Sequence, residues 1–182
     1  MPRLFTAIDL PATVNAELAS LCFGLPGAKW VAPEQLHLTL RFIGEVDGGA
    51  FREIEEVLSE VRGKPFAMQL AGLGCFPPRR PPRVLWVGID RETEPAVAAL
   101  YRRVESALVR PGLVEPEARK FSPHITLARL QQTPAARLGR FLAGNNLYRS
   151  EPFPVTSFAL YSSLLTSKGA IHQLEAEYPL TP

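Results

Sequence analysis

The chain has 182 residues, of which 46% are hydrophobic, so it is long enough to bury a sizeable core without disulfides or structural metals. Its formal net charge of +2 is too small to indicate a particular partner, and the sequence pI near 8.7 only permits an anionic one. No apolar run reaches the roughly 18 residues of a membrane span, and residues 1–10 are too short for a signal peptide, so we expect a cytoplasmic protein without a membrane partner.

The first half of the chain is predicted to alternate strands and helices. A strand over 4–10 is stopped by Pro11, which fits the first turn of a helix that runs to about Phe23. The following predicted elements are a short extended piece over 28–31, a strand over 36–43, a helix over 51–61 and strand-like segments over 66–76 and 84–89.

The second half repeats this order. A helix from Thr93 or Glu94 to about Val109 and a loop over 110–120 precede a strand over 124–130. Thr133 is predicted as the N-cap of a further helix, with Pro134 in its first turn. Strands over 153–165 and 171–178 complete the chain. The repeated order predicts an α+β fold with two pseudo-symmetric lobes in one domain, residues 1–182, around a central groove.

One four-residue pattern occurs nearly twice, as His37-Leu38-Thr39-Leu40 and as His124-Ile125-Thr126-Leu127. With three histidines and nine threonines in the chain, chance predicts only roughly 0.15 His-x-Thr triplets. Each copy lies in a predicted strand, where side chains alternate between faces. Each copy therefore presents an imidazole and a hydroxyl on one surface and anchors itself in the core with the other.

Two histidines that face each other across a groove can act as a general base and a general acid at neutral pH. The adjacent threonine hydroxyls can bind phosphoryl oxygens. This arrangement suits a strained cyclic phosphodiester, which opens in line and needs no metal to expel the leaving group. Alternatively, Thr39 and Thr126 are simply good strand formers.

Three stretches carry a resemblance to a known family: residues 3–11 (RLFTAIDLP), 36–44 (LHLTLRFIG) and 120–129 (KFSPHITLAR), with a weaker match over 160–164 and at Gly169. The chain resembles the 2H phosphoesterase superfamily and, within it, the RNA 2′,3′-cyclic phosphodiesterases once called 2′-5′ RNA ligases (the ThpR/LigT family). This resemblance implies a metal- and cofactor-free enzyme that opens the 2′,3′-cyclic phosphate of RNA ends or nucleotides to a 2′-phosphomonoester. It also implies that His37 is the proton donor and His124 the proton acceptor.

Several other residues are candidates for substrate binding. Arg41 is four residues beyond His37, so alternation predicts the same face, although a structural ion pair is equally expected there. Arg129 is five residues beyond His124, so only a bend or bulge turns it to the site, where the family pattern retains an arginine. Arg79 and Arg80, in a proline-rich loop with Arg83, either grip an RNA backbone or are simply solvated.

Aromatic residues near the motifs have two interpretations. Phe42, Trp30 and Phe121 either stack on a base or, as is commoner, pack in the core. His172 stands where the family often has tyrosine, so it is expected at the surface or against a base rather than as a third catalyst. Cys22 and Cys75 are expected to be buried thiols.

Three rival functions use the same residues. A 2′-5′ RNA ligase would run the reverse reaction at the same site, and a non-catalytic module would only bind RNA ends or nucleotides. A metal site of His37, His124 and His172 lacks supporting Cys or Glu spacing. We expect a monomer without an obligatory protein partner.

Overall fold

The computed structural model describes residues 1–78, 81–167 and 169–182. Its main sheet has eight strands in the order β10-β9-β1-β3-β7-β6-β5, with β2 paired to β7, and all the pairings are antiparallel. The strands are β1 (Arg3–Asp9), β2 (Ala28–Trp30), β3 (His37–Glu45), β5 (Leu70–Phe76), β6 (Val84–Ile89), β7 (Ile125–Leu130), β9 (Ser157–Thr166) and β10 (Gly169–Pro179).

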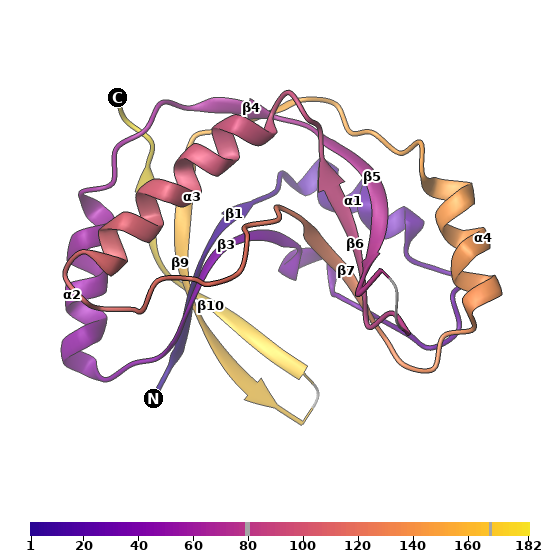
Figure 1. Ribbon diagram of the computed structural model, residues 1–182, viewed down its shortest axis with the longest axis horizontal. Coiled ribbons are helices and arrows are strands. Elements are labelled where there is room, and N and C mark those ends of the chain that lie inside the picture. The colour runs from indigo at the N-terminus through magenta and orange to yellow at the C-terminus, as the bar shows by residue number, and fades with distance from the viewer. Residues whose placement is uncertain (79–80, 168) are drawn as a thin grey trace.

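The sheet divides into two four-stranded halves. We call β1, β3, β9 and β10 the first lobe, and β2, β5, β6 and β7 the second. Leu38 of β3 and Ile125 of β7 form the one pairing between the two lobes within the described chain. In Figure 1 the hairpin of β9 and β10 projects away from the rest of the first lobe.

Two predicted strands each divide into two elements. Residues 66–76 form β4 (Phe66–Met68) and β5, and residues 153–165 correspond to β8 (Phe153–Val155) and β9. β4 and β8 pair with each other in a separate two-stranded sheet, so hydrophobicity predicted the extended backbone but not the change of sheet.

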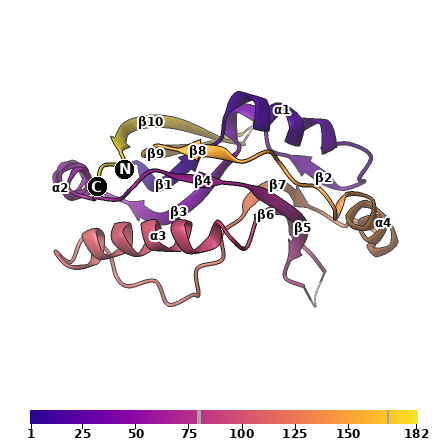
Figure 2. The same cartoon turned by 90° about the horizontal axis from the view of Figure 1, so that it is seen from above.

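The helices are α1 (Ala12–Leu21), α2 (Gly48–Ser59), α3 (Glu94–Val109) and α4 (Ala135–Asn145), with a 3₁₀ turn, η1, over Pro33–Gln35. α2 packs on α3 and β10, α3 on β3, and α4 on β5. α2 and α4 lie at opposite ends of the molecule, and α1 and α3 lie on opposite sides of the strands (Figure 2).

Helix starts depend on local capping. The Asp47 carboxylate accepts hydrogen bonds of 2.9 Å from the backbone N–H groups of Gly49 and Ala50, so α2 begins at Gly48 rather than at Phe51. The prediction that Thr133 caps α4 is wrong. The N-cap is Pro134, whose ψ of 130° is extended, and the Thr133 hydroxyl instead lies 2.8 Å from the position that a Cβ on Gly27 would occupy.

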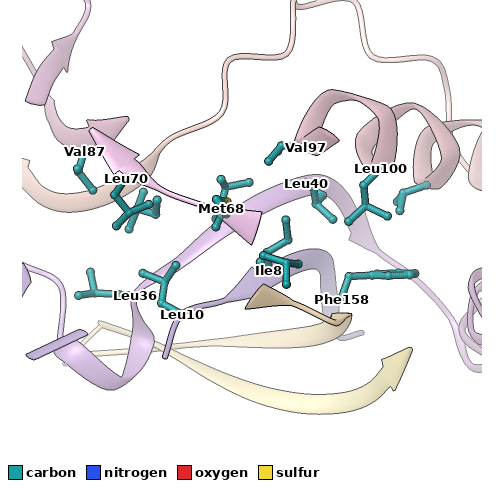
Figure 3. Close-up of a cluster of buried hydrophobic side chains, with 14 of the residues drawn as sticks. Ile8, Leu10, Leu36, Leu40, Met68, Leu70, Val87, Val97, Leu100 and Phe158 are labelled. Atoms are coloured by element: carbon teal, nitrogen blue, oxygen red, sulfur yellow. The ribbon is translucent and has the colours of Figure 1, made fainter. Parts of the chain in front are cut away.

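The core lies between α3 and the strands of both lobes. Val97 and Leu100 of α3 approach Leu40 of β3, and the cluster continues through Met68 of β4 to Leu70 of β5 (Figure 3). Leu38 and Ile125, which follow the two motif histidines, are completely buried. The motif strands are therefore held by the core through the aliphatic residues that alternate with His and Thr.

Candidate functional site

The two His-x-Thr motifs lie side by side where β3 meets β7. Leu38 and Ile125 pair there and both point into the core, so the residues on either side of them project from the opposite face. In the antiparallel register that this pair sets, His37 lies opposite Thr126, and Thr39 lies opposite His124. The four predicted catalytic residues are thus brought together on one surface, which we call the site face.

Matching β-bulges follow the two motifs. In β3 the pairing with β1 steps from Ala7↔Thr39 to Thr6↔Arg41, so Leu40 is the extra residue. In β7 the pairing with β6 steps from Trp86↔Thr126 to Leu85↔Ala128 in the same way. Beyond each bulge the side-chain alternation is shifted by one residue, so positions that would otherwise face the core face the site, and the reverse.

The bulges decide which residue beyond each motif reaches the site face. Phe42 and Arg129, each five residues beyond its histidine, lie on the site face, and both are exposed. The prediction that Arg41 shares the face of His37 is wrong, because the bulge turns it toward α3. Simple alternation thus placed Arg41 on the wrong face. Arg129 lies on the site face because β7 contains the bulge that its prediction required.

Arg41 is held by protein groups behind the site. Its Nε donates to Glu105 of α3 at 2.5 Å, and its Nη1 donates to the carbonyl of Phe42 at 2.8 Å and to Glu117 at 3.5 Å. Its Nη2 donates to the carbonyl of Glu115, and the side chain is only 10% exposed. These contacts are the structural ion pair that the sequence analysis gave as the alternative role of Arg41. They also attach β3 to the loop that leads to His124.

Both motif histidines have one ring nitrogen fixed by the backbone. Nδ1 of His37 lies 2.7 Å from the carbonyl oxygen of Gln35, and Nδ1 of His124 lies 2.7 Å from that of Ser122. A carbonyl only accepts, so Nδ1 carries the proton in each neutral ring and Nε2 carries the lone pair. Nε2 is therefore the nitrogen of each neutral ring that can accept a proton, and that of His37 lies 3.1 Å from the Thr39 hydroxyl.

His37 lies in an aromatic cluster of the first lobe. The ring of Phe5 stacks on it at 5.0 Å, and the ring of Tyr161 stacks against Phe5 at 5.5 Å and against His37 at 6.4 Å. The ring of His172 meets that of His37 edge-on at 5.3 Å. Burial lowers the pKa of His37 to about 4, the Gln35 carbonyl opposes this, and the charge of His172 lowers it further.

We expect His172→Phe to raise the pKa of His37. Phenylalanine keeps a ring against His37, so the burial persists, whereas the cation that disfavours a second positive charge is removed. The ring proton resonances of His37, followed by NMR from pH 3 to pH 8, measure this change against the wild-type titration. An unchanged or lowered pKa would show that His172 acts on His37 only by covering it.

His124 is bordered by different aromatic residues in the second lobe. Phe76 meets its ring edge-on at 5.0 Å, and Trp86 lies at 6.3 Å. The Trp86 indole lies flat over Gly74, where an added Cβ would come within 2.3 Å of the ring. Sequence reasoning missed Phe5, Tyr161, Phe76 and Trp86, although an isolated glycine inside a predicted strand is a signal of such close approach.

The remaining predicted residues fall in three groups. Phe42 is 66% exposed and touches Phe5 at 5.9 Å, so it stays a candidate for base stacking. Trp30 contacts Phe141, and Phe121 stacks on Tyr101 at 4.1 Å, which confirms the core-packing interpretation for both. Arg79 and Arg80 lie outside the described residues.

The described residues contain neither a metal-binding cluster nor a helix that could span a membrane. They contain no group of three or more His, Cys, Asp and Glu side chains that could hold a metal ion. Across the same residues, none of the helices combines the length and apolar composition needed to cross a membrane. Cys22 and Cys75 are free thiols, each partly buried.

The sequence also matches a family model, described as LigT like Phosphoesterase, twice in succession over residues 8–86 and 87–172. Each match contains one His-x-Thr motif. The chain belongs to the LigT-like phosphoesterase family. The two matches also confirm the predicted repeat in the order of elements.

Relatives named RNA 2′,3′-cyclic phosphodiesterase span nearly the whole chain. The protein from Archaeoglobus fulgidus is 35% identical over 94% of this chain and 96% of its own length. That from Thermotoga maritima is also 35% identical, over 94% and 92%. The family membership of these relatives agrees with the resemblance that the motif stretches indicated.

Solved structures with the same fold include one of LigT itself. Escherichia coli LigT in complex with 3′-AMP superposes with a TM-score of 0.80 at 28% identity, covering all of both chains. The protein TT0787 of Thermus thermophilus gives a TM-score of 0.79 at 29% identity, over 98% of this chain and 97% of its own. These similarities confirm the predicted α+β fold.

Proposed function

We propose that this LigT-like phosphoesterase hydrolyses the 2′,3′-cyclic phosphate of RNA ends or nucleotides to a 2′-phosphomonoester without a metal. The observation that carries the proposal is the pairing of the two motifs at Leu38 and Ile125, which sets two imidazoles and two hydroxyls on one face. Relatives of the same name at 35% identity and a LigT structure with a bound nucleotide support this substrate class.

In the proposed reaction, Nε2 of His124 removes a proton from water while the water oxygen bonds to phosphorus. The bond between phosphorus and the ribose 3′-oxygen breaks, and that oxygen receives a proton from Nε2 of His37. The Thr39 and Thr126 hydroxyls donate hydrogen bonds to the non-bridging oxygens, and Arg129 adds positive charge beside them. Water is added across one P–O bond, and the phosphate remains on the 2′-oxygen.

The pKa of His37 bears on which histidine gives and which accepts the proton. A pKa of about 4 leaves His37 uncharged at neutral pH in the free protein. If His37 is the proton donor, it takes up its proton when the anionic phosphate binds, because a nearby negative charge raises the pKa of an imidazole. The same lowered pKa favours a second assignment, in which neutral His37 is the base and His124 the acid.

We expect an oligoribonucleotide with a terminal 2′,3′-cyclic phosphate to yield a 2′-phosphate, with turnover retained in EDTA. The position of the phosphate on the product is read by ³¹P NMR. A 3′-phosphate would show that the 2′-oxygen leaves, and binding without product would indicate a non-catalytic module. The formation of a joined strand when a 5′-hydroxyl RNA is added would indicate the ligase.

A further inference from the structure

Tyr161 of β9 and Asp9 of β1 form a hydrogen-bonded pair on the site face of the first lobe. Asp9 pairs with His37 across β1 and β3, so the two side chains project from the same face. Tyr161 pairs with Phe5 across β9 and β1, and Phe5 lies against His37 on that face. The Tyr161 hydroxyl donates to the Asp9 carboxylate and lies 2.8 Å from each of its two oxygens. The pair therefore connects the level of Phe5 with the level of His37 along the sheet.

Two alanines occupy the positions between these levels. Ala7 of β1 and Ala159 of β9 pair with each other, and Ala7 also pairs with Thr39, so both alanines lie on the site face. Their exposed fractions are only 0% and 2%. The Tyr161 side chain must pass these two positions to reach Asp9, and methyl groups are small enough to lie beneath its ring.

The rings of Tyr161, Phe5 and His37 are nearly parallel. The angle between ring planes is 16° for Tyr161 and Phe5, 28° for Phe5 and His37, and 25° for Tyr161 and His37. Rings stacked at these separations, 5.0 to 6.4 Å, attract one another. The plane of the His37 imidazole therefore depends on the plane in which Tyr161 is held.

The stack supplies a constraint that the backbone contact of His37 does not. The hydrogen bond between Nδ1 and the Gln35 carbonyl fixes one atom of the ring but lets the ring tilt about that atom. Proton transfer at Nε2 requires a defined direction. His124 has no parallel ring against it within the described chain, because Phe76 meets it at 86° and Trp86 at 57°.

The ionisation of the pair suits a permanent hydrogen bond. Burial raises the pKa of the Tyr161 hydroxyl, and the neighbouring Asp9 carboxylate raises it further, so the hydroxyl keeps its proton at neutral pH. Among the described residues, Asp9 forms no ion pair with a lysine or arginine. Its partner is therefore the tyrosine and not a cation.

We propose that Tyr161 is a positioning residue for His37 and that Asp9 acts through it. The hydrogen bond to Asp9 fixes the outer end of the tyrosine, whose ring, together with Phe5, holds the imidazole so that Nε2 points in one direction. In this role neither Tyr161 nor Asp9 has to touch the phosphate or the water. A misplacement of about 1 Å can cost about 100-fold in rate, so a loosened Tyr161 is expected to lower kcat about tenfold.

This inference rests on the proposed function, and the test separates the two. Hydrolysis of an oligoribonucleotide with a terminal 2′,3′-cyclic phosphate is compared among variants. Tyr161→Phe and Asp9→Ala are each expected to lower kcat about tenfold while KM changes less than about twofold. Asp9→Asn should keep at least about a third of kcat, because its amide oxygen accepts the same hydrogen bond. The double variant Tyr161→Phe/Asp9→Ala should be no slower than either single variant, because both remove one shared contact.

A readout that needs no turnover is the position of the His37 ring resonances in NMR spectra. They should shift in Tyr161→Phe and Asp9→Ala and stay near their wild-type positions in Asp9→Asn. Tyr148→Phe is the matched control, because the Tyr148 hydroxyl also donates to a carboxylate, that of Glu17 at 3.1 Å, but joins α1 to the segment after α4. It should change neither kcat nor the His37 resonances.

The positioning role would be overturned by wild-type kcat in Tyr161→Phe, by additive losses in the double variant, or by an equal loss in Tyr148→Phe. Equal losses in Asp9→Asn and Asp9→Ala would also overturn it, because Asp9 would then act through its charge. These outcomes leave the cyclic phosphodiesterase intact. Failure of the wild-type protein to hydrolyse the substrate would instead overturn the proposed function, and the His37 resonances would still decide whether Tyr161 holds the ring.

Discussion

Replacing His124 or His37 by glutamine is expected to lower kcat for a cyclic-phosphate RNA end by about 10²–10⁴-fold, the usual contribution of a general acid or base. Glutamine retains a polar group near the backbone carbonyls that fix the two rings, at Ser122 and Gln35, but it cannot exchange a proton at neutral pH. Single-turnover kinetics measure the loss, and product affinity and thermal unfolding verify that each variant is folded. Activity within tenfold of wild type in both variants would refute two-histidine catalysis.

A leaving group that needs no proton separates the two roles of the histidines. In a substrate whose 3′-oxygen is replaced by sulfur, the thiolate leaves without protonation. The variant that lacks the general acid should recover most of its activity on this substrate, while the variant that lacks the base should not. Recovery in His37→Gln supports His37 as the proton donor, and recovery in His124→Gln supports the reversed assignment that the lowered pKa of His37 favours.

Arg41→Met is expected to lower the free energy of unfolding by about 3 kcal/mol. The substitution removes the partner of Glu105, whose side chain is only 17% exposed, and an uncompensated buried charge typically costs about 3–5 kcal/mol. The loop that contains Glu115 and Glu117 also loses its attachment to β3. Urea denaturation followed by circular dichroism measures the change.

Arg3→Met is the matched control for Arg41→Met. Arg3 also lies in a strand and pairs with a carboxylate, Glu45, at 3.0 Å, but both side chains are about half exposed, at 53% and 50%. Surface pairs of this kind contribute up to about 1 kcal/mol. Adding Glu105→Leu to Arg41→Met should restore part of the stability, because it removes the unpaired charge. Unchanged stability with a raised KM in Arg41→Met would show that Arg41 binds substrate after all.

The order of elements was predictable because each element is encoded locally. The alternation around His37 and His124 identified both motif strands, and the apolar spacing of Val97, Leu100 and Val104 identified α3. The division of residues 66–76 between two sheets was not predictable, because strand partners distant in sequence determine it. The start of α4 was missed because Thr133 resembles a cap, whereas the chain at Pro134 is still extended.

The residues around the two motifs were predicted less well than the motifs themselves. A bulge depends on how a neighbouring strand pairs, so periodicity alone could not show that Arg41 turns away from the site and Arg129 toward it. The rings against the two histidines come from β1, β5, β6, β9 and β10. Their sequence distance from the motifs ranges from 32 residues for Phe5 to 135 for His172, so only the folded sheet reveals them as neighbours.

The single residue pair that joins the two lobes within the described part of the main sheet also bears on the geometry of the site. Among the described residues, the main sheet joins the two lobes only at Leu38 and Ile125, while the pairing of β4 with β8 and the shared hydrophobic core also hold the lobes together. His37 and His124 directly adjoin this residue pair, and Phe42 and Arg129 lie farther along the two strands. The two imidazoles are therefore the part of the site face whose relative position the strand pairing fixes most directly.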